Sequence, residues 1–380
     1  MEPSLPPRPA ENAEGGVTEG DPEISDSRDS QFEPKNLPAR VKEHHIIIID
    51  LIRELQWLKR RMRELKRENM ALRGHTDSRE GIRREGLSSV KSVPTPRAHL
   101  LFIHGFSDHS ANYTSNLFPA LAAHSISITA FDQRGWGRSV AHPRDRGLTG
   151  PTTTVLADIT SVLSTLLPSP VPVFLMGHSM GGAEALVYAA QGPSETVSQI
   201  RGVLASAPLI ALHPHTAPWR ATVVAGRVAA KMLPRFKMVN RLDSKWLSHD
   251  EGKNREWEAD GLCHDTGTLE GLAGMLDRGE GLDRGLDTFL VREGRGEGGA
   301  LAVWIAHGTE DRINWVEGSR RYFERLGEVR DKEFRAYEGG YHNLHIDLPP
   351  GADGVQFRED VAKWILDRSG PLSDASKAKL

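Results

Sequence analysis

The pentapeptide Gly177-His178-Ser179-Met180-Gly181 constrains this chain more than any other feature. It is a G-x-S-x-G pattern that follows the apolar run VPVFLM and precedes the helix-like run GAEALVYAA. A strand, a sharp turn and a helix in this order lift the serine hydroxyl above the edge of a sheet, and the two glycines let the flanking backbones pass closely. We therefore predict that Ser179 is a nucleophile; the plainer alternative is a glycine-rich turn.

The sequence downstream of this turn offers an acid and a base. Serine is a weak nucleophile near neutral pH and needs a base that a third group holds in place. In this arrangement the acid follows the serine, and the histidine comes last. Asp311 follows the strand-like run LAVWIAHG, and His342 follows KEFRAYEG. We predict these two residues as acid and base, with Glu310 and His345 as the alternatives.

Two backbone N–H groups should bind the oxyanion that forms during attack by the serine. We assign one to Met180, directly after the nucleophile, and the other to Phe106, which follows the strand-like run LLFIHG. A further loop, FDQRGWGRS, follows the run SITAF. We expect its role to be structural, with Asp132 and Arg134 bonded to neighbouring segments.

Strands and helices alternate from residue 97 onward, which is typical of a parallel sheet covered by helices on both faces. Strands are expected at 100–105, 127–132, 171–177, 202–207, 301–308 and 332–339, and helices at 118–125, 152–167 and near 353–368. Residues 209–298 interrupt this rhythm and contain helical fragments such as ATVVAGRVAAKML. We predict an α/β core at 97–208 and 299–370, a mostly helical cap at 209–298 and a tail at 371–380.

The first part of the chain has a different composition. Residues 1–45 are rich in proline, glycine and acidic side chains and are expected to be a disordered extension. Residues 46–75 carry a seven-residue apolar repeat, with many basic side chains between its members. The repeat comprises Leu51, Leu55, Leu58, Met62, Leu65, Asn69 and Leu72.

This repeat has three readings. The plainest is a helix with a solvated basic face. The others are a coiled coil that forms a homodimer through residues 46–73, and a basic amphipathic helix on a membrane surface. Residues 76–96 are expected to be a linker, although LSSVKSV at 87–93 offers one edge strand.

Charge and cysteine content narrow the functional class. The net charge of −3 argues against a nucleic-acid partner, and the single cysteine, Cys263, cannot form an intramolecular disulfide. Cys263-His264 lacks the partners that a metal site needs, so no metal is expected. We see no signal peptide and no apolar run long enough to span a bilayer. A cytoplasmic enzyme is expected, with any contact to membranes or lipid droplets peripheral.

Five motifs together resemble the monoglyceride lipase and lysophospholipase branch of the α/β-hydrolases, especially its fungal members. They are HGFSDHSANY, FDQRGWGRS, GHSMGG, HGTEDR and YEGGYHNLH, in the same order and spacing over about residues 97–370. The resemblance implies an α/β-hydrolase fold, hydrolysis of monoacylglycerol, a helical cap and no cofactor. It also implies a catalytic triad and an oxyanion hole at the positions predicted above: Ser179, Asp311, His342, Phe106 and Met180. We expect the apolar fragments of the cap, such as VVAGRVAAKML, to hold the acyl chain of the substrate.

The resemblance implies as well that the segment around Cys263 lies near the glycerol end of the pocket. One departure concerns the start of the fold, because members of this branch begin with one or two short antiparallel strands and residues 41–96 show no such hairpin. A lysophospholipase and a general carboxylesterase are the alternative enzymes, and a coiled-coil interaction protein is the non-enzymatic alternative. A bZIP-type DNA binder is disfavoured because HHIIIID, not a basic region, precedes Leu51.

Overall fold

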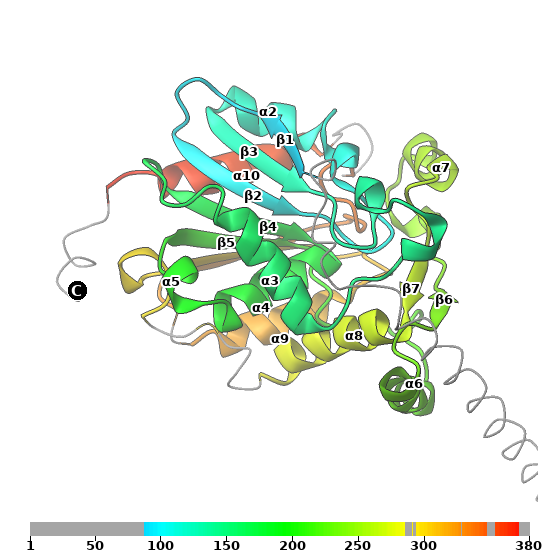
Figure 1. Ribbon diagram of the computed structural model, residues 1–380. Helices are drawn as coiled ribbons and strands as arrows, with labels where there is room; N and C mark the ends of the chain where they lie inside the picture. Colours follow the sequence, from blue (N-terminus) through cyan, green and yellow to red (C-terminus); the bar gives the residue numbers. More distant parts are fainter. Residues whose placement is uncertain (1–86, 286–290, 292–293, 328, 348–353, 372–380) are drawn as a thin grey trace, which may run out of the picture. The chain divides into compact units, whose positions relative to one another are not determined.

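A computed structural model describes residues 87–285, 291, 294–327, 329–347 and 354–371 (Figure 1). The predicted extension at 1–45, the repeat helix at 46–75 with its dimer seam, and all but the first residue of the tail lie outside the described residues.

The described chain forms one large sheet and one small sheet. The large sheet has seven strands in the order β1-β3-β2-β4-β5-β8-β9. They are β1 (Leu87–Lys91), β2 (Ala98–Ile103), β3 (Ile126–Phe131), β4 (Val173–His178), β5 (Ile200–Ser206), β8 (Ala302–Gly308) and β9 (Lys332–Tyr337). All neighbouring strands in this sheet are parallel except β1 and β3. The α/β-hydrolase fold that the sequence predicts is therefore confirmed.

Strand β1 lies inside the segment expected as a linker. It pairs antiparallel with β3, with Leu87 opposite Phe131, at the place where the sequence offers an edge strand. The linker is therefore shorter than predicted. A five-residue strand gives a weak pattern in the sequence, and pairing with the edge of β3 supplies the hydrogen-bond partners that stabilise it.

Helices cover both faces of the sheet (Figure 1). Helices α2 (Leu117–Ala123) and α10 (Val355–Asp367) lie on one face, and α3 (Thr152–Leu163), α4 (Met180–Gln191) and α9 (Val316–Arg325) on the other. Successive side chains of a strand point to opposite faces. In β2, Leu100 and Phe102 join the apolar core beneath α2 and α10, while Leu101 and Ile103 join the one beneath α3, α4 and α9.

The chain order creates a crevice at one edge of the sheet. From β2 the chain passes to β3 on one side and then returns to β4 on the other side of β2. Ligands of open α/β sheets bind outside the carboxyl ends of the strands at such a reversal. The loops after β2 and β4, which hold Phe106 and Ser179, therefore flank the crevice.

The segment between β5 and β8 contains α6 (Arg220–Met232), β6 (Lys237–Val239), α7 (Glu251–Ala259), β7 (Thr266–Thr268) and α8 (Leu269–Arg284). This segment is mostly helical, as predicted, with a small antiparallel β6–β7 sheet that the sequence did not reveal. Helix α8 packs against α4 and α9, and α6 packs on α8. We call residues 209–298 the cap; its exact limits stay a prediction.

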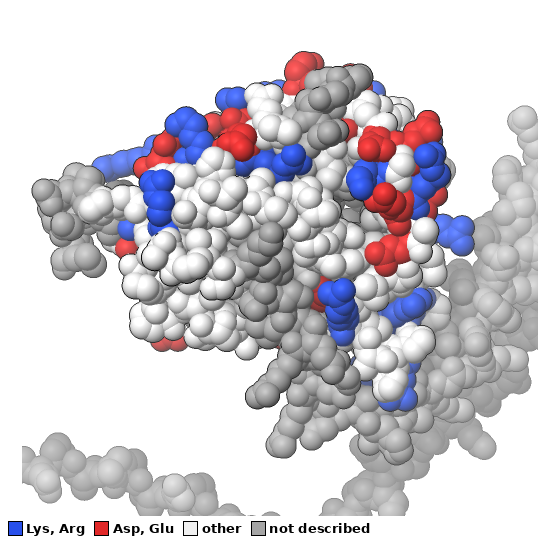
Figure 2. All heavy atoms as spheres, turned by 90° about the horizontal axis from the view of Figure 1, so that it is seen from above, with Lys and Arg blue, Asp and Glu red and all other residues white. Residues whose placement is uncertain are grey.

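Charged side chains of both signs lie close together on the face seen from above in Figure 2. Helix α7 carries both acidic and basic residues, among them Glu251, Lys253 and Arg255.

Candidate active site

Ser179 lies on a strained turn between β4 and α4. Its backbone has φ 55° and ψ −118°, a combination that L-amino acids rarely adopt. Its N–H donates to the carbonyl of Ser206, 2.9 Å away, and its own carbonyl accepts from Leu209 at 2.9 Å. These bonds to the end of β5 and the segment after it hold the turn in place.

Two glycines make this turn sterically feasible. A Cβ on Gly177 would lie 2.0 Å from the carbonyl oxygen of Gly181, and a Cβ on Gly181 would lie 2.4 Å from that of Ile103. A larger residue at Gly181 would push the turn away from β2, and one at Gly177 would push the start of α4 away from β4. The G-x-S-x-G pattern is thus required by the close approach of strand, turn and helix, as the sequence predicts.

Asp311 and His342 form a buried acid–imidazole pair. Oδ2 of Asp311 lies 2.7 Å from Nδ1 of His342, and the two side chains are almost completely buried. Oδ1 of the same carboxylate accepts backbone N–H bonds from Ile313 and Asn314 at 2.8 and 2.9 Å. With Nδ1 directed at the carboxylate, Nε2 of His342 is the nitrogen that can accept a proton.

The carboxylate of Asp311 stays ionised. Burial alone would raise its pKa, but the electrostatic interaction with His342 and hydrogen bonds from His307 and His342 outweigh this effect. The pKa of Asp311 therefore lies well below its usual range. An ionised carboxylate both orients the imidazole and stabilises the charge that the imidazole gains on taking up a proton.

The alternative acid and base occupy other places. Glu310 is exposed, whereas Asp311 is 2% exposed. The ring of His345 lies against Tyr113, with ring centroids 4.5 Å apart, and burial lowers the pKa of His345 to about 3. The structure thus brings His342, not His345, to Asp311.

The loop after β2 lies against Ser179. A Cβ on Gly105 would lie 3.1 Å from Cβ of Ser179, so this loop approaches the serine closely. Phe106 follows directly, and its ring packs on Trp136 with centroids 4.8 Å apart. The first turn of α4 begins at Met180. The predicted oxyanion donors, Phe106 and Met180, therefore come from two adjacent backbone segments beside Ser179.

The loop at 131–139 has the structural role expected of it. Oδ1 of Asp132 accepts from both the backbone N–H and the hydroxyl of Ser110, at 2.8 and 2.6 Å. Arg134 forms a two-pronged ion pair with Asp158 of α3 at 2.9 and 2.7 Å. These bonds fix the loop beside the site without placing its charges in the site.

A cavity of about 240 Å³ lies at Ser179, between the core and the cap. Its lining from the core includes Phe106, Asp108, Asn112, Ser179 and His342. The cap contributes Leu242, Leu247, Glu256, Trp257 and Asp260. Ser179 and His342, the predicted nucleophile and base, thus face the same space, and polar side chains make up much of its wall.

Helix α6 is not part of this lining among the described residues, although we expected its apolar side chains to hold the acyl chain. Val224 and Val228 are 59% and 57% exposed. That expectation is therefore wrong for this conformation. The helix packs on α8 through its small residues, such as Ala229 and Ala230, and this contact turns the valines outward.

Comparison with known proteins places this geometry in a family. The profile of the family described as "Serine aminopeptidase, S33" matches residues 94–349, more than half of the chain. The chain belongs to this family. It is a hydrolase of the α/β-hydrolase class, as its sheet order and nucleophile turn also indicate.

Relatives within the family carry more specific names. A monoglyceride lipase of Saccharomyces cerevisiae is 30% identical, over 71% of this chain and 84% of that protein. The monoglyceride lipase of Homo sapiens is 28% identical, over 75% of this chain and 88% of the relative. A crystal structure of a soluble variant of the S. cerevisiae enzyme with a substrate analog has a TM-score of 0.64, at 27% identity, covering 75% of this chain and 91% of that one.

One residue of the site escaped sequence reasoning. Nδ2 of Asn314 donates to the carbonyl of Ala207 at 2.8 Å and lies 3.4 Å from Oγ of Ser179. Asn314 is 1% exposed, and its backbone N–H also binds Asp311. Its position three residues after the predicted acid was the available signal. Asn314 thus connects the loop of Asp311 with Ser179.

Cys263 has partners that the sequence did not reveal. The neighbouring His264 turns away, with its Nε2 3.0 Å from the carbonyl oxygen of Gly135. Instead, His109 and Asp260 lie beside Cys263, so that one ligand atom from each of the three falls within 4.8 Å of the others. His109 lies on a core loop, 151 residues before Asp260 in the sequence, and reaches the cap only in the folded chain. The neighbours of Cys263 in the sequence therefore did not reveal this partner.

Proposed function

We propose that this protein hydrolyses the ester bond of monoacylglycerols to glycerol and a free fatty acid. Ser179 attacks the ester carbonyl carbon while Nε2 of His342 takes the proton of the hydroxyl group. The backbone N–H groups of Phe106 and Met180 stabilise the oxyanion. When the tetrahedral intermediate collapses, the glycerol oxygen leaves and takes this proton from His342.

Water completes the reaction. His342 removes a proton from a water molecule, which attacks the acyl group on Ser179 and releases the fatty acid. Asp311 keeps Nδ1 of His342 engaged throughout, so that Nε2 faces the reacting atoms. The observation that carries the proposal is the Asp311–His342 pair at 2.7 Å beside a cavity that Ser179 also lines.

The charge of the cavity favours a neutral head group. Three carboxylates, those of Asp108, Glu256 and Asp260, line it together with one lysine, Lys253. The phosphate of a lysophospholipid would be repelled by this excess of negative charge. Glycerol hydroxyls, in contrast, can donate hydrogen bonds to carboxylates. The charge of the cavity wall therefore supports monoacylglycerol over lysophospholipid, the main alternative.

We further propose that the cap docks on a lipid surface. Nearly all the large exposed apolar side chains of the described chain lie between residues 219 and 239: Trp219, Val224, Val228, Met232, Phe236, Met238 and Val239. Val224, Val228 and Met232 recur every four residues and form one stripe along α6. Exposed apolar patches of this kind mark interaction surfaces.

The residues around this stripe fit an interface with lipid. Basic side chains flank it, including Arg220, Lys231 and Arg235. They would attract the anionic head groups of a membrane. Among the described helices, none is long and apolar enough to cross a bilayer. We therefore propose peripheral contact through α6, which would bring lipid substrates near the cavity.

A substrate panel tests the proposed reaction. Purified full-length protein is assayed with monooleoylglycerol, dioleoylglycerol, oleoyl lysophosphatidylcholine and a short soluble ester, and fatty acid release is measured. We expect the highest kcat/KM on monooleoylglycerol, with Ser179→Ala as the blank. A higher value on lysophosphatidylcholine would replace the proposal with the lysophospholipase alternative.

A further inference from the structure

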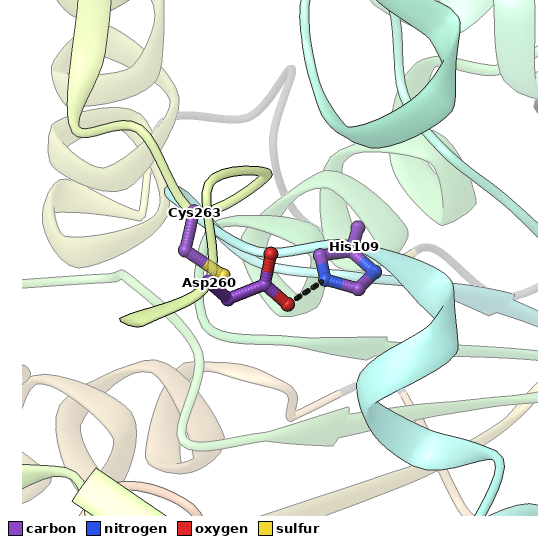
Figure 3. A group of neighbouring side chains, drawn as sticks. All are labelled: His109, Asp260 and Cys263. Carbon is purple, nitrogen blue, oxygen red and sulfur yellow. Dashed lines mark hydrogen bonds and ion pairs between the residues drawn. The ribbon is translucent and has the colours of Figure 1, made fainter. Parts of the chain in front are cut away.

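A core loop and a cap loop meet near the cavity in a cluster of three different side chains (Figure 3). His109 precedes the short 3-10 helix at Ser110–Tyr113, whereas Asp260 ends α7 and Cys263 follows it. Nε2 of His109 lies 2.9 Å from Oδ2 of Asp260. One ligand atom of each residue, the sulfur of Cys263 included, lies within 4.8 Å of the other two.

These three donors match the preferences of a borderline-soft divalent ion. Imidazole, carboxylate and thiolate are the groups that Zn²⁺ uses in proteins, at distances of roughly 2.0–2.3 Å. Donor atoms around a tetrahedral ion therefore lie roughly 3.2–3.8 Å apart. The cluster needs only a small contraction, by side-chain rotation, to reach this spacing, and it leaves one coordination position open.

The surroundings of the cluster favour a cation as well. His109 is 3% exposed, so its imidazole is held in place by packing. The carboxylates of Asp108, Asp260 and Asp265 all act electrostatically on the sulfur of Cys263. The same carboxylates create a negative potential at the sulfur, which a divalent cation would neutralise.

We propose that His109, Asp260 and Cys263 form a binding site for Zn²⁺ or a similar transition-metal ion, and that the bound ion inhibits the enzyme. On binding, the thiol of Cys263 releases its proton to solvent, and the proton on Nε2 of His109 moves to Nδ1 of the same ring through exchange with water. The thiolate sulfur, the freed Nε2 of His109 and one oxygen of Asp260 then coordinate the ion. The ion takes the place of the hydrogen bond between His109 and Asp260.

Inhibition follows from where the site lies. Asp260 is part of the cavity wall, and His109 follows Asp108, another residue of that wall. The loop that holds His109 also carries Phe106, the predicted oxyanion donor. An ion at the cluster links the cap to this loop and narrows the cavity. The inhibition rests on the proposed function, whereas metal binding does not.

The test measures binding and activity separately. Full-length protein, first stripped with a chelator, is incubated with Co²⁺ or Zn²⁺ and passed over a desalting column. We expect one retained ion per chain, and a thiolate-to-cobalt charge-transfer absorption band in the Co²⁺ form. Cys263→Ser should remove the band and weaken Zn²⁺ binding by more than about tenfold. In the activity arm, Zn²⁺ should inhibit the stripped wild type reversibly and spare Cys263→Ser.

A second variant guards against adventitious binding. His213 and His215 stack on each other in another loop and offer a competing pair of imidazoles. His213→Ala with His215→Ala should keep the retained ion and the absorption band. Loss of the band in this variant, its persistence in Cys263→Ser, or the absence of a retained ion in wild type would overturn the site. Binding without inhibition would overturn only the inhibitory role, while absence of ester hydrolysis in stripped wild type would count against the proposed function alone.

Discussion

The carboxyl edge of the sheet and helix α6 of the cap are built by opposite means. At the sheet edge, Ser179, Asp311 and His342 are at most 8% exposed, and each is held by short hydrogen bonds or by glycines that permit close contact. On α6, Ala230 is the one buried residue, and valines face outward. The sheet edge thus holds the predicted catalytic groups in a fixed geometry, whereas α6 presents an exposed apolar surface.

The largest effect should come from breaking the fixed geometry at the base. His342→Ala removes the proton acceptor, and kcat should fall by on the order of 10³-fold or more. His345→Ala should have a much smaller effect, because His345 packs on Tyr113 and does not contact Asp311. Kinetics of both variants on a soluble ester check this, and the reverse ranking would make His345 the base.

Asn314→Ala should cause a smaller loss of activity at the same edge of the sheet. The change leaves the carbonyl of Ala207 unpaired and removes the amide beside Oγ of Ser179. We expect kcat to fall about tenfold with little change in KM, since the amide positions the nucleophile rather than the substrate. A variant that loses thermal stability but keeps kcat would show that Asn314 is only structural.

Helix α6 should show the opposite pattern. Val224→Glu with Val228→Glu places charge on the exposed stripe, so that hydrolysis of monooleoylglycerol in anionic vesicles should fall several-fold. Activity on a soluble ester should stay near wild type, because α6 does not line the described cavity. Val355→Glu, at another exposed valine on α10, is the matched control. Equal losses on both substrates would contradict a role confined to the lipid surface.

The smallest expected effect is on the free energy of unfolding, and it concerns the contact between cap and core. Glu184 of α4 and Arg278 of α8 form an ion pair at 2.8 Å that is almost completely buried. Burial raises the pKa of Glu184 to about 7, from its ordinary value of 4.5, although Arg278 opposes the shift. Between these two values the folded protein holds a proton that the unfolded chain has released. The stabilisation from this group is therefore complete below pH 4.5 and lost as the pH rises through about 7.

Denaturant unfolding checks this sign. From about pH 5 to about pH 8, the free energy of unfolding should decrease more in wild type than in Glu184→Gln, whose amide does not titrate. Parallel pH profiles in the two proteins would show that Glu184 is ionised throughout and that its ion pair with Arg278 dominates over burial.

The contrast between the sheet edge and helix α6 also explains which features could be predicted from the sequence. Ser179 follows β4 directly, and Asp311 and His342 lie in the loops that follow β8 and β9, so that local patterns were enough to predict their positions at the sheet edge. Asn314 and the cluster at Cys263 depend on contacts between distant segments, such as the 151-residue separation of His109 and Asp260. The direction of the α6 valines depends on how this helix packs on α8, which its own apolar pattern does not specify.

The central claim is that Ser179 is the nucleophile of an ester hydrolase, and the most direct test is to locate a covalent adduct. The full-length protein is treated with a fluorophosphonate, digested and analysed by mass spectrometry. We predict a single phosphonylated serine, Ser179, with loss of hydrolysis in proportion to labelling, and no adduct in Ser179→Ala. Labelling at a different serine, or full hydrolytic activity in protein labelled completely at Ser179, would contradict the account.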